Sequence, residues 1–412
     1  MSSRAPEVVI VGAGLAGLAC ALDLTAAGRA VLLVEAEEEA GGRMRTDVVR
    51  GFRLDRGFQV FNTAYPQVKR RLELKSLRLR PFTSGFVLAG ADGSRYLVDP
   101  TRHPGRAGDL LPGRVLSVRD LVALGLLGAR DAALPAAVLK RAPEASAARA
   151  LRRAGVSQRA VDEVLAPFLA GVFLEDRLET SSRMLHLVLR SMVRGTLCLP
   201  QDGIGAVPGQ LAALLPRQAL RFGVRVDRLT AQGAVLADGT ELRARAVVVA
   251  TGAAQAARLL PGLEVPAARG VTTFYHAAPV SPLREPTLVV DAGRQVLNTV
   301  VLSEVVPGFS PDRRALVSTS VLGTDADEVR VRRRVGELYG VDTAQWEPLA
   351  EYRIAEALPA APAPLALSRG TRLSPGRYVC GDHRATASVQ GALASGARAA
   401  REVAADLAAS RW

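Results

Sequence analysis

The chain has 412 residues, of which 49% are hydrophobic, so it is long enough for two domains and too apolar to be intrinsically disordered. Aromatic residues make up only 4%, which argues against a site built as an aromatic cage. The net charge of +13 suits a nucleic acid or an anionic membrane as a partner. Because the sequence shows no known nucleic-acid-binding module and no basic stretch interleaved with aromatic residues, we expect no nucleic acid partner.

Cysteine and histidine are sparse. Cys20, Cys198 and Cys380 are too widely spaced for a disulfide framework or a metal motif, so we expect a reduced, cytoplasmic compartment and no bound metal. The N-terminal sequence enters an apolar strand at once and lacks the cleavage site of a signal peptide. The sequence contains no run of about 18 uncharged apolar residues, so we expect no membrane-spanning helix. The histidines are scattered, and we interpret them as surface or structural side chains: His103, His186, His276 and His383.

The first predicted elements form a βαβ unit, with a strand at 7–11, a helix at 15–27 and a strand at 30–35. Glycines in the first turn permit a tight bend, close approach of a pyrophosphate and packing of helix on strand, while the helix N-terminus faces the phosphates. Glu35, with Ala36 behind it, is placed to accept hydrogen bonds from ribose hydroxyl groups. The unit therefore predicts dinucleotide binding by Glu35, Ala36 and the GxGxxG turn of Gly12, Ala13, Gly14, Leu15, Ala16 and Gly17.

The residues after Glu35 favour a flavin dinucleotide over NAD. Gly41 and Gly42 allow a second close approach of the backbone, and Arg43 offers a guanidinium group for phosphate or for the flavin edge. NAD does not need this second motif, whereas the longer flavin dinucleotide must be held further along. The alternative interpretation is an ordinary loop with a solvated arginine.

Residues 8–43, VVIVGAGLAGLACALDLTAAGRAVLLVEAEEEAGGR, resemble the N-terminal signature of an FAD superfamily. That superfamily includes flavin amine oxidases, protoporphyrinogen oxidases and phytoene desaturases. Residues 51–61, GFRLDRGFQVF, are similar to the family's segment that passes beside the isoalloxazine ring. The resemblance implies that Arg43, Gly57, Phe58 and Gln59 lie near the flavin.

Residues 222–252 read as short strands with a turn at 237–240, followed by a strand that ends in ATG. This stretch resembles the family's β-meander and its returning parallel strand. The resemblance places the backbone of Val226 on the adenine, and Thr251 and Gly252 near the nucleotide. The break at 200–208 resembles the return of the chain into the FAD domain.

The expected fold class is α/β. A Rossmann-like FAD-binding domain, with a parallel sheet and a β-meander, would be assembled from residues 1–75, 205–262 and 370–412. An α+β substrate domain would be inserted as residues 76–204, mostly helical in pattern, and 263–369, with antiparallel strands. Strands are predicted at 287–291, 296–303 and 315–321, and a Pro/Ala linker at 358–365.

Near the C-terminus, a strand at 377–382 runs into Gly381 and Asp382, and Ser388 then fits the N-cap of a helix from Val389 to about residue 408. The resemblance implies that Gly381 and Asp382 bind the ribityl or phosphate region, and that Ser388 and Val389 lie at the pyrimidine end of the flavin. The helix N-terminus there would stabilise negative charge on the reduced ring. Small residues at 391, 392, 394 and 396 would let the helix lie close to cofactor and sheet.

The sequence contains a single GxGxxG, so no second site for NAD(P)H is visible. All three lysines lie at 69, 75 and 140, away from the later segment where amine oxidases of the family carry their lysine, and Ser388 stands where many of them have an aromatic residue. No C-terminal cysteine has the context of a flavin tether, so we expect non-covalent FAD.

The predicted function is an FAD-dependent oxidoreductase that takes hydride from an apolar substrate onto flavin N5, as phytoene desaturases do, with reoxidation by oxygen, a quinone or another acceptor. The sequence identifies no catalytic residue. The alternatives are a flavin amine oxidase, a protoporphyrinogen-oxidase-like enzyme, or a flavin-binding protein without turnover.

Residues 110–140 mix apolar helical stretches with spaced basic residues. Between 100 and 160 there are 11 lysines and arginines against 4 acidic residues, a net charge of +7. The pattern fits peripheral contact with the inner face of a membrane and entry of a lipid-like substrate. It fits better a core-facing helix with a solvated basic face.

Overall fold

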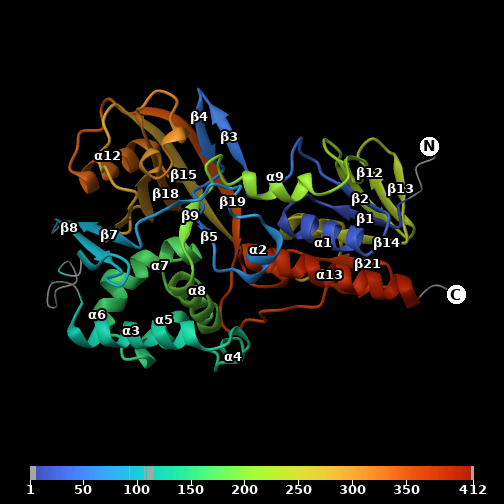
Figure 1. The fold of residues 1–412 in the computed structure, drawn as a ribbon, viewed down its shortest axis with the longest axis horizontal. Coiled ribbons are helices and arrows are strands. Elements are labelled where there is room, and N and C mark those ends of the chain that lie inside the picture. Colours follow the sequence, from blue (N-terminus) through green and yellow to red (C-terminus); the bar gives the residue numbers. More distant parts are fainter. Residues whose placement is uncertain (1–5, 92, 106–107, 109–115, 410–412) are drawn as a thin grey trace.

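The structure is a computed structural model that describes residues 6–91, 93–105, 108 and 116–409. The chain forms a mixed α/β fold with two lobes, one built on a parallel sheet and the other on a larger, mostly antiparallel sheet (Figure 1). The α/β fold class expected from the sequence is confirmed. The boundaries of the two predicted domains stay a prediction.

The first lobe contains a six-stranded sheet with the order β10-β2-β1-β14-β21-β20, in which all strands but the last run parallel. β1 and β14 are apolar along their whole length, as expected for strands covered on both faces. The strands are β1 (Val8–Val11), β2 (Val31–Val34), β10 (Leu220–Arg221), β14 (Ala246–Val249), β20 (Arg372–Ser374) and β21 (Arg377–Val379).

Two apolar cores sandwich this sheet, because alternate residues of each strand point to opposite faces. One face packs on helices α1 (Leu15–Ala26), α9 (Ala206–Ala213) and α13 (Val389–Ala409). The other carries the predicted meander, β11 (Val226–Thr230), β12 (Gly233–Leu236) and β13 (Glu241–Arg243), with α10 (Ala253–Leu259) beside it.

The second lobe contains a seven-stranded sheet with the order β19-β15-β18-β17-β16-β7-β8. Its neighbours are antiparallel except β16 and β7, which are parallel. The strands are β7 (Gly85–Gly90), β8 (Gly93–Val98), β15 (Ala268–Ala278), β16 (Leu288–Asp291), β17 (Asn298–Val301), β18 (Ala315–Leu322) and β19 (Glu347–Pro359).

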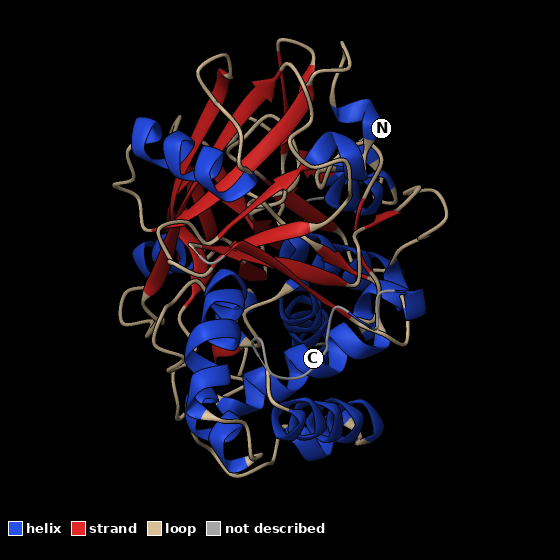
Figure 2. Ribbon diagram, turned by 90° about the vertical axis from the view of Figure 1, so that its left-hand side faces the viewer, coloured by secondary structure: helices blue, strands red, loops and turns tan. Residues whose placement is uncertain are grey.

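Helices cover both faces of the larger sheet, and Figure 2 shows most of them gathered below the strands. One face packs on α12 (Glu328–Tyr339). The other packs on a helical layer whose main members are α3 (Val118–Ala133), α5 (Ala147–Arg153), α7 (Ala166–Phe173) and α8 (Ser182–Arg194). Shorter helical pieces are α2 (Pro66–Arg71), α4 (Ala136–Leu139), α6 (Gln158–Ala160), η2 (Val161–Leu165), η3 (Arg217–Ala219), α11 (Leu302–Val305), η4 (Pro307–Phe309) and η5 (Asp382–Arg384).

Small sheets join the lobes. The hairpin of β3 (Thr46–Val49) and β4 (Phe52–Asp55) packs on the β15 and β19 end of the large sheet. A second small sheet has the order β5-β9-β6, with β5 (Phe61–Asn62), β6 (Arg80–Pro81) and β9 (Leu197–Leu199). In the described part of the chain, no helix has both the length and the apolar character needed to cross a bilayer.

The region 76–204 carries helices α3 to α8, in line with its mostly helical pattern, and it also contributes β7 and β8, a hairpin at the edge of the large sheet. Two other details of the sequence prediction were wrong. The strand predicted at 296–303 ends at Val301, where α11 begins. The predicted linker at 358–365 starts inside β19, which continues to Pro359 because it pairs with Ala268 of β15.

Candidate cofactor and substrate site

The glycine-rich turn has the geometry that its sequence predicts. Gly12 has a φ of +106°, and a Cβ on this residue would lie 3.0 Å from the carbonyl oxygen of Ala250. A Cβ on Gly17 would lie 1.9 Å from the carbonyl oxygen of Gly12. Both positions therefore require glycine, one for the turn and the other for the contact of α1 with β1.

The start of α1 can receive an anion. Gly14 is the N-cap, no side chain caps the helix, and its first turn, with Leu15, Ala16 and Gly17, holds no acidic residue. A Cβ on Gly14 would meet no atom within 4 Å, so the turn has room above it. Uncapped N–H groups at a helix N-terminus beside open space fit the pyrophosphate of a dinucleotide.

Glu35 orders the same turn from the end of β2. Its carboxylate accepts a hydrogen bond from the Ala13 N–H at 2.6 Å and another from the Glu37 N–H at 3.1 Å, across Ala36. The carbonyl of Glu35 accepts from Val224, two residues before Val226 of the meander. Glu35 and the meander therefore lie at one edge of the sheet, as the ribose and adenine positions require.

The second glycine motif and the ATG motif lie against the first turn. The Gly41 N–H donates to the carbonyl of Ala13 at 3.0 Å, and a Cβ on Gly42 would lie 3.4 Å from the Gly14 Cα. The Thr251 nitrogen would lie 3.2 Å from a Cβ on Gly12, and Gly252 is the N-cap of α10. The three motifs meet at the carboxyl ends of β1, β2 and β14, where open α/β sheets bind their ligands.

Arg43 connects this edge to the C-terminal motif. Its guanidinium group forms an ion pair with the Asp382 carboxylate at 2.6 Å and donates to the carbonyl of Ala357 at 2.8 Å. The Gln59 amide donates to the Arg43 carbonyl at 2.7 Å, and the Gly381 N–H donates to the Ser395 hydroxyl at 2.9 Å. Residues 43, 59, 381 and 382 are thus brought together although they are far apart in the sequence.

His383 adds an unsatisfied group beside this motif. The ring is buried, its Nε2 has no hydrogen-bond partner, and burial lowers the pKa of His383 to about 4. The ring is therefore neutral near pH 7 and keeps one polar atom unpaired. An orphaned buried nitrogen next to Gly381 and Asp382 is consistent with a polar ligand in this region.

Helix α13 begins as the sequence predicts. The Ser388 hydroxyl accepts a hydrogen bond from the Gly391 N–H at 3.1 Å, and Val389 is the first helical residue. A Cβ on Gly391 would lie 1.8 Å from the Thr386 carbonyl oxygen, and one on Gly396 would lie 2.1 Å from the Ala16 carbonyl oxygen. The small residues therefore bring α13 directly against the first turn of α1.

Gly57 and Phe58 lie on the face of the large sheet. A Cβ on Gly57 would lie 2.7 Å from Cδ1 of Ile354, and the Phe58 N–H donates to the Thr273 hydroxyl at 3.4 Å. Ile354 belongs to a small hydrophobic core cluster, the Ile354 cluster: Ala170, Leu174, Val271, Leu297, Leu322, Ile354 and Ala357. Because the carbonyl of Ala357 also accepts a hydrogen bond from Arg43, the Ile354 cluster touches both predicted flavin-contacting segments.

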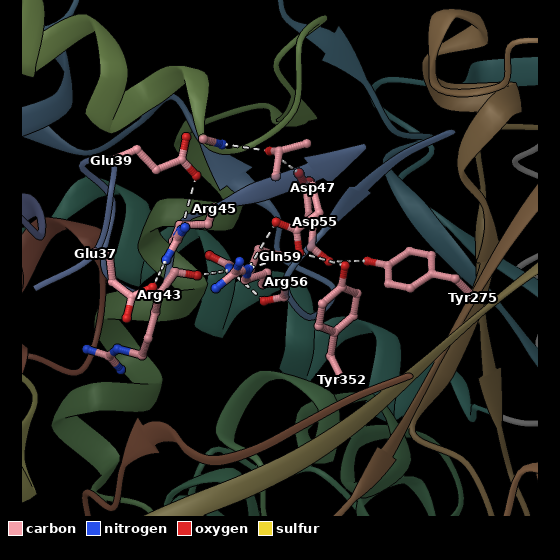
Figure 3. A network of polar contacts seen from close by, with 12 residues as sticks. Glu37, Glu39, Arg43, Arg45, Asp47, Asp55, Arg56, Gln59, Tyr275 and Tyr352 are labelled. Atoms are coloured by element: carbon pink, nitrogen blue, oxygen red, sulfur yellow. Dashed lines mark hydrogen bonds and ion pairs between the residues drawn. The ribbon is translucent and has the colours of Figure 1, made fainter. Parts of the chain in front are cut away.

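A polar network that the sequence did not reveal supports residues 43–59 (Figure 3). Arg56 and the Tyr352 hydroxyl both donate to the Asp47 carboxylate. Burial alone would raise the pKa of Asp47, but these hydrogen bonds outweigh it, so the pKa lies below its ordinary value. The Tyr275 hydroxyl donates to the Asp55 carbonyl at 2.7 Å. Tyr275 and Tyr352 come from β15 and β19, more than two hundred residues away, so no local sequence signal marks them.

Asp55 is the buried centre of this network. Its carboxylate accepts from the Thr46 hydroxyl at 2.6 Å and from the Ile204 N–H at 2.9 Å. Burial nevertheless raises the pKa of Asp55 to about 6. The bond to Ile204 fixes the chain where it enters α9.

The described residues contain no group of three or more histidine, cysteine or acidic side chains that could hold a metal ion. The cysteines are free and buried, and burial raises the pKa of Cys380 to about 12. A buried thiol of this kind is unreactive. Residues 110–115 of the predicted membrane-contact segment lie outside the described residues.

Comparison with known proteins agrees with this geometry. The family model for flavin-containing amine oxidoreductases matches residues 15–404. The zeta-carotene-forming phytoene desaturase of Myxococcus xanthus is 30% identical over 260 residues, which cover 56% of this chain and half of that enzyme's length.

Two solved structures share the fold along nearly the whole chain. An oxidoreductase from Methanosarcina mazei matches with a TM-score of 0.73 and 18% identity, covering 96% of this chain and 99% of that one. Cyclohexylamine oxidase from Brevibacterium oxydans matches with a TM-score of 0.68 and 18% identity, covering 98% of this chain and 100% of that one. At this identity the likeness concerns the fold alone.

Proposed function

Because the chain belongs to the family of flavin-containing amine oxidoreductases and is an FAD-dependent oxidoreductase, we propose that it takes hydride from an apolar substrate, in the manner of a phytoene desaturase. The electrons would pass on to oxygen, a quinone or another acceptor. The observation that carries the proposal is the Ile354 cluster, whose apolar side chains lie beside Gly57 and Arg43.

The residues described above fit FAD. Gly12 to Gly17, Glu35, Ala36 and Gly42 would hold the pyrophosphate and ribose, with Val226, Thr251 and Gly252 at the nucleotide end. Arg43, Gly57, Phe58, Gln59, Gly381, Asp382, Ser388 and Val389 would surround the flavin end. When bound, FAD supplies a hydride acceptor. We propose that it is held without a covalent bond.

The chain's own side chains would bind the substrate, orient it and exclude water. The apolar part of the substrate would bind beside the Ile354 cluster, because apolar surface gains free energy when it leaves water. The hydroxyl of Thr273, held by the Phe58 N–H and by Ser320 at 3.2 Å, would lie 3.9 Å from a Cβ on Gly57, which would also meet Ile354. Dehydrogenation of an apolar substrate needs few protein acids and bases.

The alternatives are amine oxidation and protoporphyrinogen-oxidase-like chemistry. The match to the family model for flavin-containing amine oxidoreductases favours the first of these. All three lysines lie at 69, 75 and 140, away from the later segment where amine oxidases of the family carry their lysine. We therefore place amine oxidation second.

The proposal is tested by anaerobic reduction of the bound flavin, followed by visible absorbance. We expect a long apolar polyene, delivered in detergent micelles, to bleach the flavin, and putrescine, cyclohexylamine and porphyrinogens to leave it oxidised. Ile354→Asn should slow the bleaching about tenfold because it places an amide against apolar substrate, while Leu373→Asn, on exposed β20, should not. Bleaching by an amine alone would contradict the proposal.

The compartment is also a proposal. Three free, buried cysteines, with no disulfide among the described residues, fit a reducing, cytoplasmic environment.

A further inference from the structure

The solvent-facing side of α3 is apolar along its length. Val118, Val122 and Leu126 follow one another at intervals of four residues and are 59%, 55% and 68% exposed. Gly125, Ala129 and Ala133 are exposed on the same side of α3, and the exposed Arg119 and Arg130 flank it. The six uncharged residues form one side of the helix, the outer face of α3.

The inner side of the same helix is already occupied. Ala123 and Leu127 are buried in the helical layer with Leu151 and Leu185. A helix on the surface of a soluble domain ordinarily carries charges opposite its buried stripe. In α3 both sides are apolar, so the core does not explain the outer face.

Basic side chains are exposed around the outer face of α3, whereas the acidic side chains of the segment point inward. Arg119 and Arg130 are exposed on α3, and Lys140 and Arg141 are exposed just after it. The two carboxylates of the segment point inward: Asp120 accepts from the Ser117 and Ser157 N–H groups, and Asp131 pairs with the His186 Nδ1 at 2.8 Å. The described surface from 116 to 142 therefore presents cations without exposed acids.

Val193, near the end of the neighbouring helix α8, extends the outer face of α3. A Cβ on Gly128 would lie 3.7 Å from Cγ2 of Val193, which is 47% exposed at the end of α8. Figure 1 shows α3 at the outer edge of the helical layer, away from the parallel sheet. The face is thus open to an external partner.

We propose that the outer face of α3 docks on an anionic lipid bilayer. An α-helix of 16 residues is about 24 Å long, and it would lie in the interface with Val118, Val122 and Leu126 among the acyl chains. Arg119 and Arg130 would reach the phosphate groups beside them. One helix face is narrow for a stable protein interface, which buries about 800 Å² on each partner, so the lipid surface is the better fit.

The surface is independent of the proposed reaction, since docking requires no turnover. The docking surface also bears on the proposed reaction, because the helical core under α3 includes Leu169 and Phe173 of α7, whose Ala170 belongs to the Ile354 cluster. If the proposed apolar substrate fails to reduce the flavin, docking on vesicles is still expected. The two proposals can therefore fail separately.

The test is co-sedimentation of the full-length, FAD-loaded protein with vesicles. One set contains only phosphatidylcholine, and in the other about a third of the lipid is phosphatidylglycerol. We expect binding to the anionic vesicles that weakens with salt. Val122→Ser combined with Leu126→Ser, and separately Arg119→Glu combined with Arg130→Glu, should each weaken it about tenfold or more.

Matched controls carry the same chemical changes elsewhere. Leu214→Ser with Val329→Ser removes apolar side chains that are both 62% exposed, at the C-cap of α9 and on α12. Arg228→Glu with Arg243→Glu reverses the same charge on the meander. Both controls should bind within about twofold of the unchanged protein. Retained flavin absorbance and melting temperature show that each variant is folded.

A second readout does not depend on these variants. A polarity-sensitive dye on a Leu126→Cys variant can be attached selectively, because the native cysteines are buried. Its emission should shift to the blue on anionic vesicles. An unshifted emission, no sedimentation at low salt, or unchanged binding of the α3 variants would overturn the proposal. Equal binding to soluble polyglutamate, without a contribution from Val122 and Leu126, would overturn it in favour of an acidic protein partner.

Discussion

At the scale of single residues, the pair of Arg43 and Asp382 joins the two ends of the candidate site. The residues are 339 positions apart, and the carboxylate is buried while the guanidinium is partly exposed. A buried carboxylate with one cationic partner has capacity for a further hydrogen bond. We propose that FAD supplies this further hydrogen bond.

Asp382→Asn should weaken FAD binding by about ten- to a hundredfold, since a hydrogen bond to a charged group contributes about 1.5–3 kcal/mol. The measurement is fluorescence titration of the apoprotein with FAD. Asp312→Asn provides the control, because Asp312 also pairs with an arginine, Arg314, but on the surface. An equal loss in both variants would assign the effect of Asp382 to general destabilisation.

Asp55 and His383 should have opposite effects on stability in acid. The pKa of Asp55 is raised to about 6, so the folded protein takes up this proton first, and Asp55 adds stability as the pH falls from about 6 to about 4. The pKa of His383 is lowered to about 4, so the folded state binds this proton less readily than the unfolded state. The stability that neutral His383 contributes is therefore fully present above about pH 6.5 and is lost as the pH falls toward 4. Each effect amounts to about 3 kcal/mol, and the two largely offset each other.

Single substitutions should reveal each effect. Asp55→Asn removes the gain in acid, so its melting temperature should fall more steeply than that of the unchanged protein between about pH 6 and 4. His383→Gln removes the loss of stability that His383 causes in acid. The melting temperature of this variant should therefore fall less steeply between about pH 6 and 4 than that of the unchanged protein. Thermal melts across this range check both, and parallel curves for all three proteins would show that neither group titrates in this window.

Individual site residues could be predicted from the sequence only where residues close to them in the chain determine their geometry. The glycines of the first turn and the Ser388 cap are set by the backbone of a few neighbouring residues, and the structure places them as expected. The bonds from Tyr275 to Asp55 and from Phe58 to Thr273 arise only when the β15 strand lies over residues 55–58. No spacing in the sequence encodes that approach.

At the scale of elements, close packing of α1 and α13 positions two helix N-termini at the candidate site. Gly396→Ala would place a Cβ 2.1 Å from the backbone of Ala16, so the helices must separate. We expect a loss of about 2–4 kcal/mol in stability and weaker FAD binding. Chemical denaturation of the FAD-loaded protein measures the first quantity.

Gly209→Ala is the matched control. Gly209 also lies within a helix, α9, and a Cβ there would meet no atom within 4 Å. Alanine should therefore raise the stability by up to about 1 kcal/mol through its helix propensity. A similar loss in both variants would mean that the close approach of α1 and α13 does not explain the effect.

Elements were predictable where one periodicity dominates. The apolar runs of β1 and β14 and the long helix α13 follow their sequence patterns directly. β19 was missed because its sequence, EPLAEYRIAEALP, alternates charged and apolar residues around alanines that also suit a helix, and its pairing with β15 decides the conformation. β7 and β8 were missed for a similar reason, since β7 is completed by the distant β16.

At the scale of the whole molecule, the candidate site is assembled from segments near 12–17, 35–43, 57–59, 251–252 and 381–389. The ends of β1, β2, β14 and β21 bring four of these segments to one edge of the parallel sheet, and the hydrogen bond of Gln59 to the Arg43 carbonyl joins residues 57–59 to them. A ligand that touches all of them adds contacts that the protein alone lacks. FAD should therefore act as a structural component of the fold.

Removal of FAD should lower the melting temperature, and added FAD should restore it. A ligand at a hundred times its dissociation constant stabilises the folded state by about 2.7 kcal/mol, so the melting temperature should rise with FAD concentration. Hydrogen exchange should show protection of both the first turn and the start of α13, because these segments share the ligand. Acid precipitation of the FAD-loaded protein should leave the yellow colour in solution, as expected for a cofactor without a covalent tether. Colour that stays in the pellet would contradict the non-covalent prediction, and a melting temperature independent of FAD would show that the segments are held together by the protein alone.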